Sequence, residues 1–466
     1  MVQSHPVEGH SALDAPVDPL QLKRRLVSGG FWALGAKIGS VVFAVGVNAL
    51  LARLLSIEEM GAYFLILSVV TAAALIVRGG LEQTSLRLVA ESIGLGALSR
   101  ARSAVAKVFL LVTASAIVVG GFLWIFGWGL LADFVFQIPV MAAASGLITL
   151  WVIAMAYQML IAQTFRGFND VRLASIFGGL ATSFLSALFF ASVWLTVSQA
   201  SLVTVLTITL GCTSLSILLG LGLIVPKVRA IPAGGEPISF AEILRNAAPL
   251  LVVNLTFIII ETADIWLMGA FRGPEEVAIY GAARRLVLLI SMAQYVANSA
   301  ISPTIGVLHA QGQTRKLERW LRLTATLVSI PGTLVIVAFM LAGALILELV
   351  FGPTYREGGG ILIILAVGKL FVSLTGSCTA TLVMAGYNRS VMWISLIAGA
   401  IGLGAAAAVV ESHGGIGVAA AMATAAGFQH ILMLVFARKL CGVWTHASPK
   451  MLPQSFRLLV RYARRD

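Results

Sequence analysis

Long apolar runs separated by short polar segments make up most of the chain. A helix that spans a membrane needs roughly 20 consecutive, mostly apolar residues, and such runs recur throughout the sequence. The pattern predicts an all-α integral membrane protein with about 12 transmembrane helices. The predicted helices are 26–54, 60–81, 105–127, 139–164, 171–195, 200–225, 247–271, 277–302, 321–351, 360–385, 390–410 and 415–438.

Charged residues interrupt the seventh and eighth of these runs. Glu261 and Asp264 lie in the run 247–271, and Arg284 and Arg285 lie early in the next run. A charge at the centre of a bilayer costs about 2.5–3.5 kcal/mol on insertion scales, so such residues usually face a protein interior or a watery cavity. Two acids on one helix and two arginines on the next predict a polar cavity between membrane helices.

Composition agrees with a membrane protein. Of the 466 residues, 59% are hydrophobic and 11% are charged, with a mean hydropathy of +0.97, whereas a soluble domain carries roughly 25% charged residues. The net charge of +12 raises nucleic acid as a partner. The bases sort by loop, however, which indicates that they orient the helices, and we expect no nucleic-acid partner.

The sorting of bases also predicts the orientation of the chain. Residues 23–25 are Lys-Arg-Arg, and the loops on the same side as this segment hold most of the 32 Lys and Arg residues. The loops on the other side hold only Arg53, Arg272 and Arg356. Because positive loops remain in the cytoplasm, both termini are predicted to be cytoplasmic. The outer loops are too short to contain a folded domain.

Composition shifts divide the chain into five segments. A Gly- and Pro-containing connection separates two groups of six helices, and the C-terminal residues 455–465 place apolar and basic positions on different helical faces. The predicted segments are a disordered cytoplasmic tail (1–22), an N-terminal six-helix half (23–225), a cytoplasmic linker (226–246), a C-terminal six-helix half (247–440) and a basic amphipathic tail (441–466).

The two halves resemble each other. Glu-Glu-Met-Gly-Ala-Tyr at 58–63 follows the first predicted helix, and Glu-Glu-Val-Ala-Ile-Tyr at 275–280 follows the seventh, 217 residues later. Residues 166–169 and 385–388 match at an offset of 219. Because six is an even number, both copies would insert the same way round. The repeat predicts two parallel halves around a central cavity, with the substrate site between them.

Other kinds of site have little support in the sequence. Cys212, Cys378 and Cys441 lie far apart, and neither they nor the six histidines have the spacing of a disulfide framework or a metal site. No phosphate-binding loop of an ATPase is present. We therefore expect no catalytic residue, metal or cofactor, and an energy source such as an ion gradient, the membrane potential or removal of the product.

Three segments resemble a known family. They are Phe-Trp-Ala-Leu at 31–34, Ala-Arg-Leu-Leu-Ser-Ile-Glu-Glu-Met-Gly-Ala-Tyr at 52–63, and Phe-Arg-Gly-Pro-Glu-Glu-Val-Ala-Ile-Tyr-Gly-Ala-Ala at 271–283. These segments are similar to those of polysaccharide transporters, the oligosaccharide-lipid flippases of the multidrug/oligosaccharidyl-lipid/polysaccharide exporter superfamily. The resemblance covers about 24–440, and its motifs are mainly turn residues.

The resemblance implies a function and a location. A flippase of this family moves a polyprenyl-diphosphate-linked oligosaccharide from the inner to the outer leaflet of the bacterial cytoplasmic membrane, for O-antigen, capsule or exopolysaccharide synthesis. Its two halves rock in alternating access, with the diphosphate on cavity bases and the lipid tail in the bilayer. The implied partners are the lipid-linked oligosaccharide, membrane lipid, and a polysaccharide polymerase with its export machinery.

Five bases lie within or at the edge of predicted helices, and they are the candidate ligands for the diphosphate and sugars: Lys37, Arg78, Arg284, Arg285 and Lys369. Arginine binds phosphate through two hydrogen bonds, and lysine acts as a point charge. Arg78 also stands four residues before Glu82, a spacing that favours a local ion pair. Arg284 and Arg285 point about 100° apart, so at most one of them is expected to face the cavity fully.

Asn254, Glu261 and Asp264 lie on one side of the seventh predicted helix. They are candidates for a proton or sodium site that couples transport. The alternative is a structural ion pair of an acid with Arg284 or Arg285.

Three other functions remain as alternatives. A multidrug exporter of the same superfamily would favour an acidic or apolar cavity, whereas the embedded bases here outnumber the mid-helix acids. A major-facilitator transporter would show Gly-x-x-x-Asp-Arg between helices two and three, and residues 85–92 lack this motif. A polymerase or glycosyltransferase of lipid-linked sugars would need large outer loops.

Overall fold

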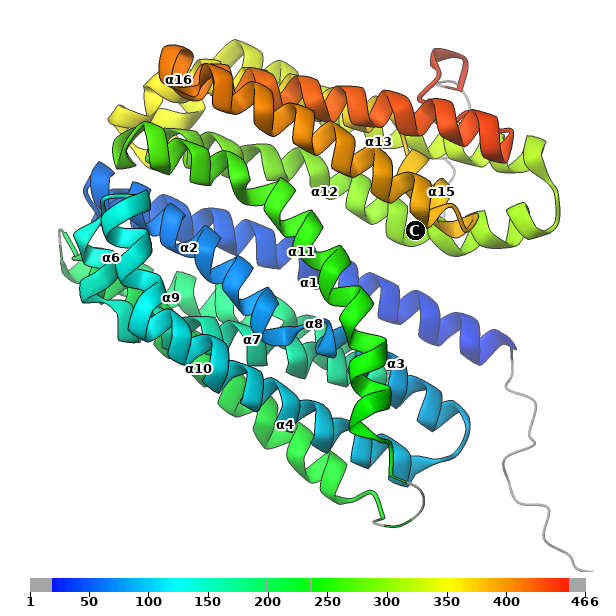
Figure 1. Ribbon diagram of the computed structural model, residues 1–466. Coiled ribbons are helices and arrows are strands. Elements are labelled where there is room, and N and C mark those ends of the chain that lie inside the picture. The colour runs from blue at the N-terminus through cyan, green and yellow to red at the C-terminus, as the bar shows by residue number, and fades with distance from the viewer. Residues whose placement is uncertain (1–18, 198, 233, 235–236, 452–466) are drawn as a thin grey trace, which may run out of the picture.

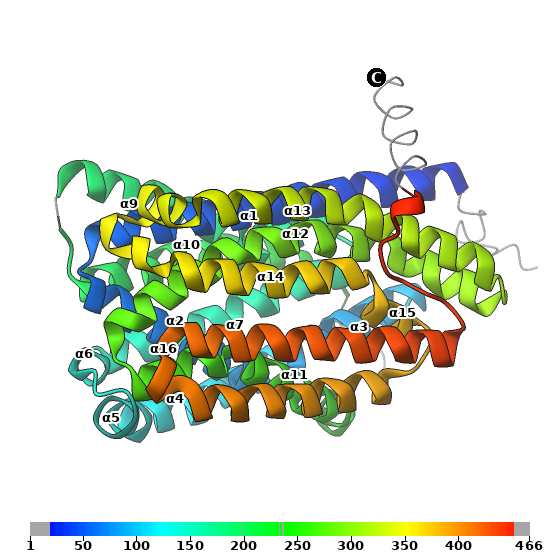
Figure 2. The same cartoon turned by 90° about the horizontal axis from the view of Figure 1, so that it is seen from above.

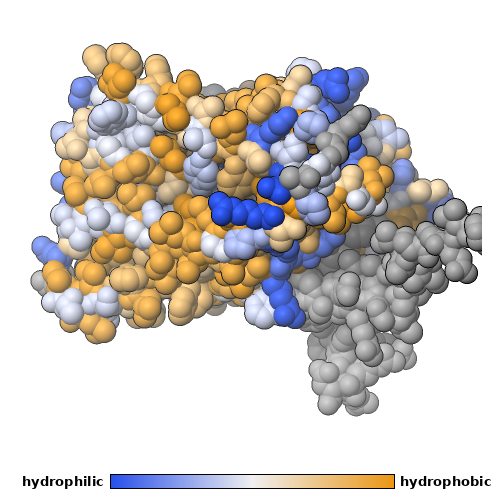
Figure 3. Space-filling model, turned by 90° about the horizontal axis from the view of Figure 1, so that it is seen from below, coloured by the Kyte–Doolittle hydropathy of each residue, from blue (hydrophilic) through white to orange (hydrophobic). Residues whose placement is uncertain are grey.

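The computed structural model describes residues 19–197, 199–232, 234 and 237–451, and all its regular elements within these ranges are helices. They form two bundles packed side by side, the N-terminal half (blue to green) and the C-terminal half (green to red) (Figure 1). Ten of the described helices are long and apolar enough to cross a membrane. Apolar residues cover most of the face in Figure 3, and hydrophilic residues gather toward its ends. The predicted all-α membrane class is confirmed.

The N-terminal half contains ten α-helices and three π-helical segments. They are α1 (Pro19–Leu54), α2 (Ile57–Arg78), α3 (Leu81–Gly94), α4 (Leu98–Phe122), η1 (Leu123–Gly127), α5 (Trp128–Leu130), η2 (Leu131–Val135), α6 (Pro139–Ala143), α7 (Ser145–Gly167), α8 (Val171–Ser175), η3 (Ile176–Leu180), α9 (Ala181–Thr196) and α10 (Leu202–Arg229).

The C-terminal half contains six α-helices and two short 3₁₀ segments. They are α11 (Phe240–Phe271), α12 (Pro274–Ala310), α13 (Thr314–Phe351), η4 (Pro353–Gly358), α14 (Gly359–Thr375), α15 (Cys378–Met384), α16 (Asn388–Cys441) and η5 (Pro449–Met451).

Glycines with positive φ change the helix pattern at two places. The predicted helix 360–385 is interrupted at Gly376, whose φ of 71° separates α14 from α15. The predicted helices 390–410 and 415–438 are two limbs of α16, which folds back at Gly414, where φ is 53° and ψ is −144° (Figure 2). The ten membrane-spanning candidates include α16 once and omit α12, so the number of twelve spans stays a prediction.

Some of the predicted segments have other limits in the structure. The connection between the halves is shorter than 226–246, because α10 continues to Arg229 and the side chain of Ser239 caps the start of α11. Residues 442–448 do not belong to a free tail, since Val443 and Thr445 are fully buried against the C-terminal half. Residues 19–22 of the predicted disordered tail 1–22 belong to α1, which begins at Pro19. The rest of that tail and the amphipathic segment 455–465 lie outside the described residues.

The halves meet closely where α2 packs against α11 and α12. A Cβ on Gly61 would come within 1.8 Å of the Pro274 carbonyl oxygen, and one on Gly281 within 2.4 Å of the Phe64 ring. Gly61 therefore allows the two backbones to approach closely, and Gly281 leaves room for the Phe64 ring. In addition, the Trp266 indole donates a hydrogen bond of 2.9 Å to the Ser68 hydroxyl. The base count predicts that this end of the molecule faces outward.

Helix α11 connects the two halves and crosses between them diagonally (Figure 1). Its first turn lies on the N-terminal half, where Arg100 of α4 forms an ion pair of 2.7 Å with Glu242. A Cβ on Gly80, in the turn between α2 and α3, would come within 2.6 Å of the Ala247 carbonyl oxygen. The second part of α11 packs against α16 in the C-terminal half and carries Glu261 and Asp264.

Candidate functional site

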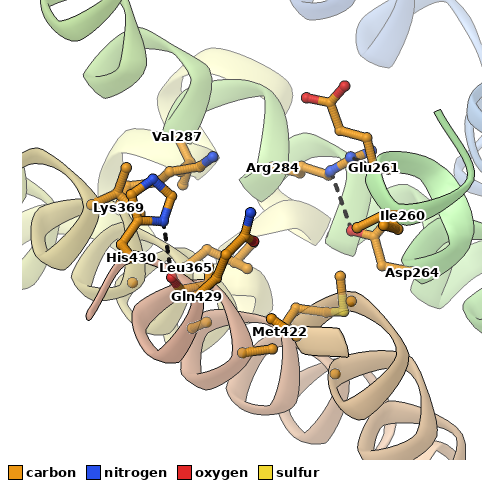
Figure 4. A pocket seen from close by; sticks show the side chains of 18 of the residues that line it. Ile260, Glu261, Asp264, Arg284, Val287, Leu365, Lys369, Met422, Gln429 and His430 are labelled. Atoms are coloured by element: carbon orange, nitrogen blue, oxygen red, sulfur yellow. Dashed lines mark hydrogen bonds and ion pairs between the residues drawn. The ribbon is translucent and has the colours of Figure 1, made fainter. Parts of the chain in front are cut away.

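A polar pocket of about 340 Å³ lies inside the C-terminal half, between α11, α12, α14 and α16 (Figure 4). Its apolar wall includes Phe257, Leu365 and Met422. Six polar or charged side chains also line it: Glu261, Asp264, Arg284, Lys369, Gln429 and His430. The helices thus place four charged groups within one cavity of an otherwise apolar bundle.

Asp264 forms the structural ion pair of the pocket. Its Oδ2 lies 3.2 Å from Nε of Arg284 and accepts a hydrogen bond of 3.0 Å from the Tyr280 hydroxyl. Its Oδ1 accepts a hydrogen bond of 2.9 Å from the amide of Ile265. A buried carboxylate is tolerated when a base and several donors satisfy its oxygens, as they do here. Of the two alternatives for Asp264, the geometry shows the ion pair, and Arg284 is its partner.

Glu261 differs from Asp264 although both lie on α11. The guanidinium of Arg284 donates a hydrogen bond to the backbone carbonyl of Glu261 and not to its carboxylate. Glu261 lines the pocket, is exposed, and forms no ion pair within the described chain. Its carboxylate is therefore available to a proton, a cation or a hydroxyl group.

Lys369 is the base of the pocket that forms no salt bridge among the described residues. It lies half-buried on α14, and no acid of the described residues pairs with it. Nδ1 of the neighbouring His430 lies 3.0 Å from the Ala426 carbonyl, to which it donates, so Nε2 of the neutral ring accepts. Gln429 donates a hydrogen bond of 2.9 Å to the Ser395 hydroxyl. An ammonium group in apolar surroundings is unfavourable when unpaired, which makes Lys369 suited to an anionic ligand.

Three of the predicted bases do not line this pocket. Arg78 is buried beside Glu82, with Nε 3.6 Å from its carboxylate, as the spacing predicted. Lys37 on α1 lies 5.5 Å from the Tyr295 ring of α12. Arg285 lies 5.7 Å from the Phe64 ring of α2, so it turns toward the other half while Arg284 lines the pocket.

This polar pocket lies within the C-terminal half, and the predicted substrate site between the two halves stays a prediction. Asn254 is half-buried on α11 and is not among the lining residues. Gln429, His430 and Tyr280 were not predicted as site residues. The signal for the first two was weak but present, because they are adjacent polar residues within the apolar run 415–438.

No cluster of His, Cys, Asp and Glu suited to a metal ion occurs in the part of the chain that the structure describes. The pocket therefore offers two acids, two bases and an imidazole to its ligand. One acid and one base neutralise each other, and the second acid and second base remain unpaired. Such a site can bind a phosphate or carboxylate at Lys369 and a proton or cation at Glu261.

Comparison with protein families gives two matches. The model of a family described as polysaccharide biosynthesis protein matches residues 26–309, and the MatE family model matches residues 249–410. The first match covers the N-terminal half and the first two helices of the C-terminal half, and the second covers most of the helices around the pocket. No curated protein matches the chain.

Solved structures share the fold. An inward-facing multidrug resistance MATE family transporter of the MOP superfamily is 14% identical, with a TM-score of 0.72 over 86% of this chain and 94% of that one. The lipid II flippase MurJ, in an inward closed conformation, is 15% identical, with a TM-score of 0.66 over 86% of each chain. A MOP superfamily transporter from Pyrococcus furiosus is 12% identical, with a TM-score of 0.65 over 92% of this chain and 99% of that one.

Proposed function

Because the chain belongs to the polysaccharide biosynthesis protein family, we propose that it is a flippase for a polyprenyl-diphosphate-linked oligosaccharide. It moves this lipid across the bacterial cytoplasmic membrane, so that a polysaccharide polymerase at the outer leaflet can use it for O-antigen, capsule or exopolysaccharide synthesis. The protein acts as a transporter and carries out no chemical step on the sugar.

Lys369 is the observation that carries this proposal. It is a half-buried base that lines a pocket and forms no salt bridge among the described residues, although Glu261 lines the same pocket. A diphosphate supplies the missing negative charge and several acceptor oxygens, and these compensate the cost of desolvating the ammonium group. Arg284 adds a second positive charge at the same wall, although it shares this charge with Asp264.

Two further bases lie where the halves meet. Lys37 of the N-terminal half lies beside the Tyr295 ring of the C-terminal half. Arg285 of the C-terminal half lies beside the Phe64 ring of the N-terminal half. A headgroup that passes between the halves would contact these bases before and after it reaches Lys369. The lipid tail would remain in the bilayer, and the oligosaccharide would occupy the polar space.

Glu261 is the proposed coupling group. It lines the same pocket and is free of the ion pair that holds Asp264. Uptake of a proton or sodium ion by its carboxylate would remove a negative charge near Lys369 and so strengthen the binding of a diphosphate. Release of the ion would weaken that binding, which gives an ion gradient a way to drive transport.

A multidrug exporter is the second candidate function. The MatE model matches residues 249–410, and the pocket combines the unpaired acid Glu261 with an apolar wall. A lipophilic cation would fit these two features. It would gain nothing from Lys369, which would repel it.

Reconstitution in liposomes tests the two functions against each other. A fluorescent polyprenyl-diphosphate oligosaccharide is placed in one leaflet, and its appearance in the other leaflet is measured by an impermeant quencher. The same vesicles are loaded with a cationic dye to measure its export. We expect leaflet exchange of the lipid by the wild type, and loss of exchange in Lys369→Gln.

The matched control is Lys439→Gln, because Lys439 is an exposed base at the end of α16. This variant should exchange lipid at the wild-type rate. Export of the dye without lipid exchange would assign the protein to the multidrug exporters. Lipid exchange that is unchanged in Lys369→Gln would show that the pocket does not bind the headgroup.

A further inference from the structure

Residues 442–448, which we term the strap, run across the ends of α13, α14 and α16. Val443, Thr445 and Ser448 are buried, although they belong to no helix. A Cβ on Gly376 would come within 2.2 Å of the Thr445 carbonyl oxygen, so the glycine allows the strap to approach the break between α14 and α15. The base count predicts that this end of the molecule is cytoplasmic.

The strap caps the end of α14. The last carbonyl groups of a helix have no partner within it. The Thr445 hydroxyl donates a hydrogen bond of 2.7 Å to the carbonyl of Thr375, and the Ala447 amide donates one of 2.8 Å to that of Leu374. The Ser448 amide donates a hydrogen bond of 3.0 Å to the Thr326 hydroxyl, which fixes the strap to α13 as well.

A charged network surrounds the middle of the strap. Nη2 of Arg322, on α13, lies 3.3 Å from Nε2 of His446. Because a guanidinium can only donate, Nε2 must be the unprotonated acceptor. Glu318 lies between two arginines, 3.5 Å from Arg322 and 3.6 Å from Arg438 of α16. Arg438 lies 5.6 Å from the Trp444 ring, which contacts His446 edge-to-face.

This network can accept no further positive charge without rearrangement. Among the described residues, the charged groups that face His446 are Arg322 and Glu318 from α13 and, through Trp444, Arg438 from α16. The carboxylate of Glu318 already balances the charges of both Arg322 and Arg438. Protonation of Nε2 would place a third cation 3.3 Å from Arg322 and would remove the acceptor of its hydrogen bond.

We propose that the strap is an acid-sensitive clamp, which holds the ends of α13, α14 and α16 together while His446 is neutral and releases them when His446 is protonated. Release would uncap α14, the helix that carries Lys369, six residues before Thr375. The clamp therefore connects the pH at this face of the molecule to the helix that forms one wall of the pocket.

The direction of the effect follows from proton linkage. Burial of the ring and the neighbouring Arg322 lower the pKa of His446 in the docked strap, and the more distant Glu318 opposes this shift. The released strap would have the ordinary histidine pKa of about 6.5. Docking is therefore fully favoured above that pKa and weakens as the pH falls through it, because the released strap binds the proton more tightly. One proton changes the docking equilibrium at most about tenfold between pH 7.5 and pH 5.5.

Cys441 is the reporter for the strap, because it is buried in the same apolar cluster as Val443. It is the last residue of α16, and its thiol is free and buried. In a protein that carries Cys212→Ala and Cys378→Ala, the maleimide labelling rate of Cys441 is measured in lipid nanodiscs across this pH range. Each rate is divided by that of the denatured protein at the same pH, which removes the effect of thiol ionisation. We expect the corrected rate to rise by up to about tenfold on acidification.

Two histidine variants separate the clamp from general acid effects. His446→Gln keeps an acceptor for Arg322 and cannot be protonated, so its corrected rate should not change with pH. His413→Gln alters an exposed histidine beside the fold-back of α16 at Gly414 and should keep the wild-type response. The same response in His446→Gln as in the wild type, or no response in the wild type, would overturn the proposal.

Hydrogen exchange provides a second measurement on the unaltered chain. The Ala447 amide is bonded to Leu374 in the docked strap. Its protection factor, corrected for the intrinsic rate at each pH, should fall on acidification by the same factor as the labelling rate rises. Constant protection would contradict release of the strap. Neither measurement requires transport, so the clamp can be refuted while the flippase function stands.

Discussion

Asp264 provides the most direct test of how charge is arranged in the pocket. The change Asp264→Asn keeps the shape of the side chain and its ability to accept from Tyr280, but it removes the negative charge opposite Arg284. If the ion pair is structural, the variant should be less stable and the guanidinium should be left without a counter-ion. If Asp264 were a free coupling group, its neutralisation would change transport and leave stability nearly unchanged.

The expected magnitude follows from burial. The side chain of Asp264 is 5% exposed and that of Arg284 is 28% exposed. Removal of one partner of a buried pair costs about 3–5 kcal/mol, because the remaining charge is desolvated and unpaired. Arg284 retains some contact with solvent, so we expect a loss near the lower limit, about 3 kcal/mol. Removal of both charges should cost less than the sum of the single changes.

The assay is a double-mutant cycle on the free energy of unfolding in mixed micelles, followed by circular dichroism. The cycle comprises the wild type, Asp264→Asn, Arg284→Gln and the double variant. A coupling energy of about 2 kcal/mol or more would establish the pair. Asp133→Asn serves as the control, since Asp133 is an exposed acid, and should shift stability by no more than about 0.5 kcal/mol. Additive effects, or a loss in Asp264→Asn as small as that of the control, would refute the structural pair.

Three further outcomes are expected. Glu261→Gln should abolish transport at a normal level of membrane insertion, and normal export in vivo would dismiss its coupling role. Gly281→Val should separate the halves at the Phe64 contact, so that the thiol of a Ser68→Cys reporter is labelled faster than in the parent; equal labelling would place the close approach elsewhere. Trp128→Phe removes a fully buried indole and its hydrogen bond and should cost about 1–3 kcal/mol in the unfolding assay, whereas no loss would contradict its part in packing.

The apolar pattern predicted the helices well because lipid-facing and core residues are both apolar, so a span is visible as an uninterrupted run. Breaks were harder to locate. Gly376 and Gly414 both have positive φ, but so many glycines occur in these runs that nothing local distinguishes the two that break helices. The close approach of Thr445 to Gly376 depends on a segment almost 70 residues away in sequence.

The site was predicted in part for a similar reason. Glu261 and Asp264 are one turn from each other, and Arg284 follows within the next helix, so their meeting required only a hairpin of two helices. Lys37 and Arg78 are also charged residues within apolar runs. Whether they reach a cavity, however, depends on how helices that are distant in sequence pack together. Arg78 forms an ion pair with Glu82, four residues later in the sequence. A base in an apolar run therefore does not by itself indicate a cavity.

The repeat explains why symmetry was a poor guide to the pocket. An offset of 217 residues relates Glu261, Asp264 and Arg284 to Ala44, Val47 and Leu67, all of which are apolar. The duplication therefore preserved the turn segments 58–63 and 275–280, but not the charges of the pocket. A polar group within the bilayer is retained only where something offsets its desolvation. The charges that line the pocket all belong to the C-terminal half, so the transported ligand should contact the two halves unequally, with its charge on the C-terminal half and its apolar surface against the N-terminal one.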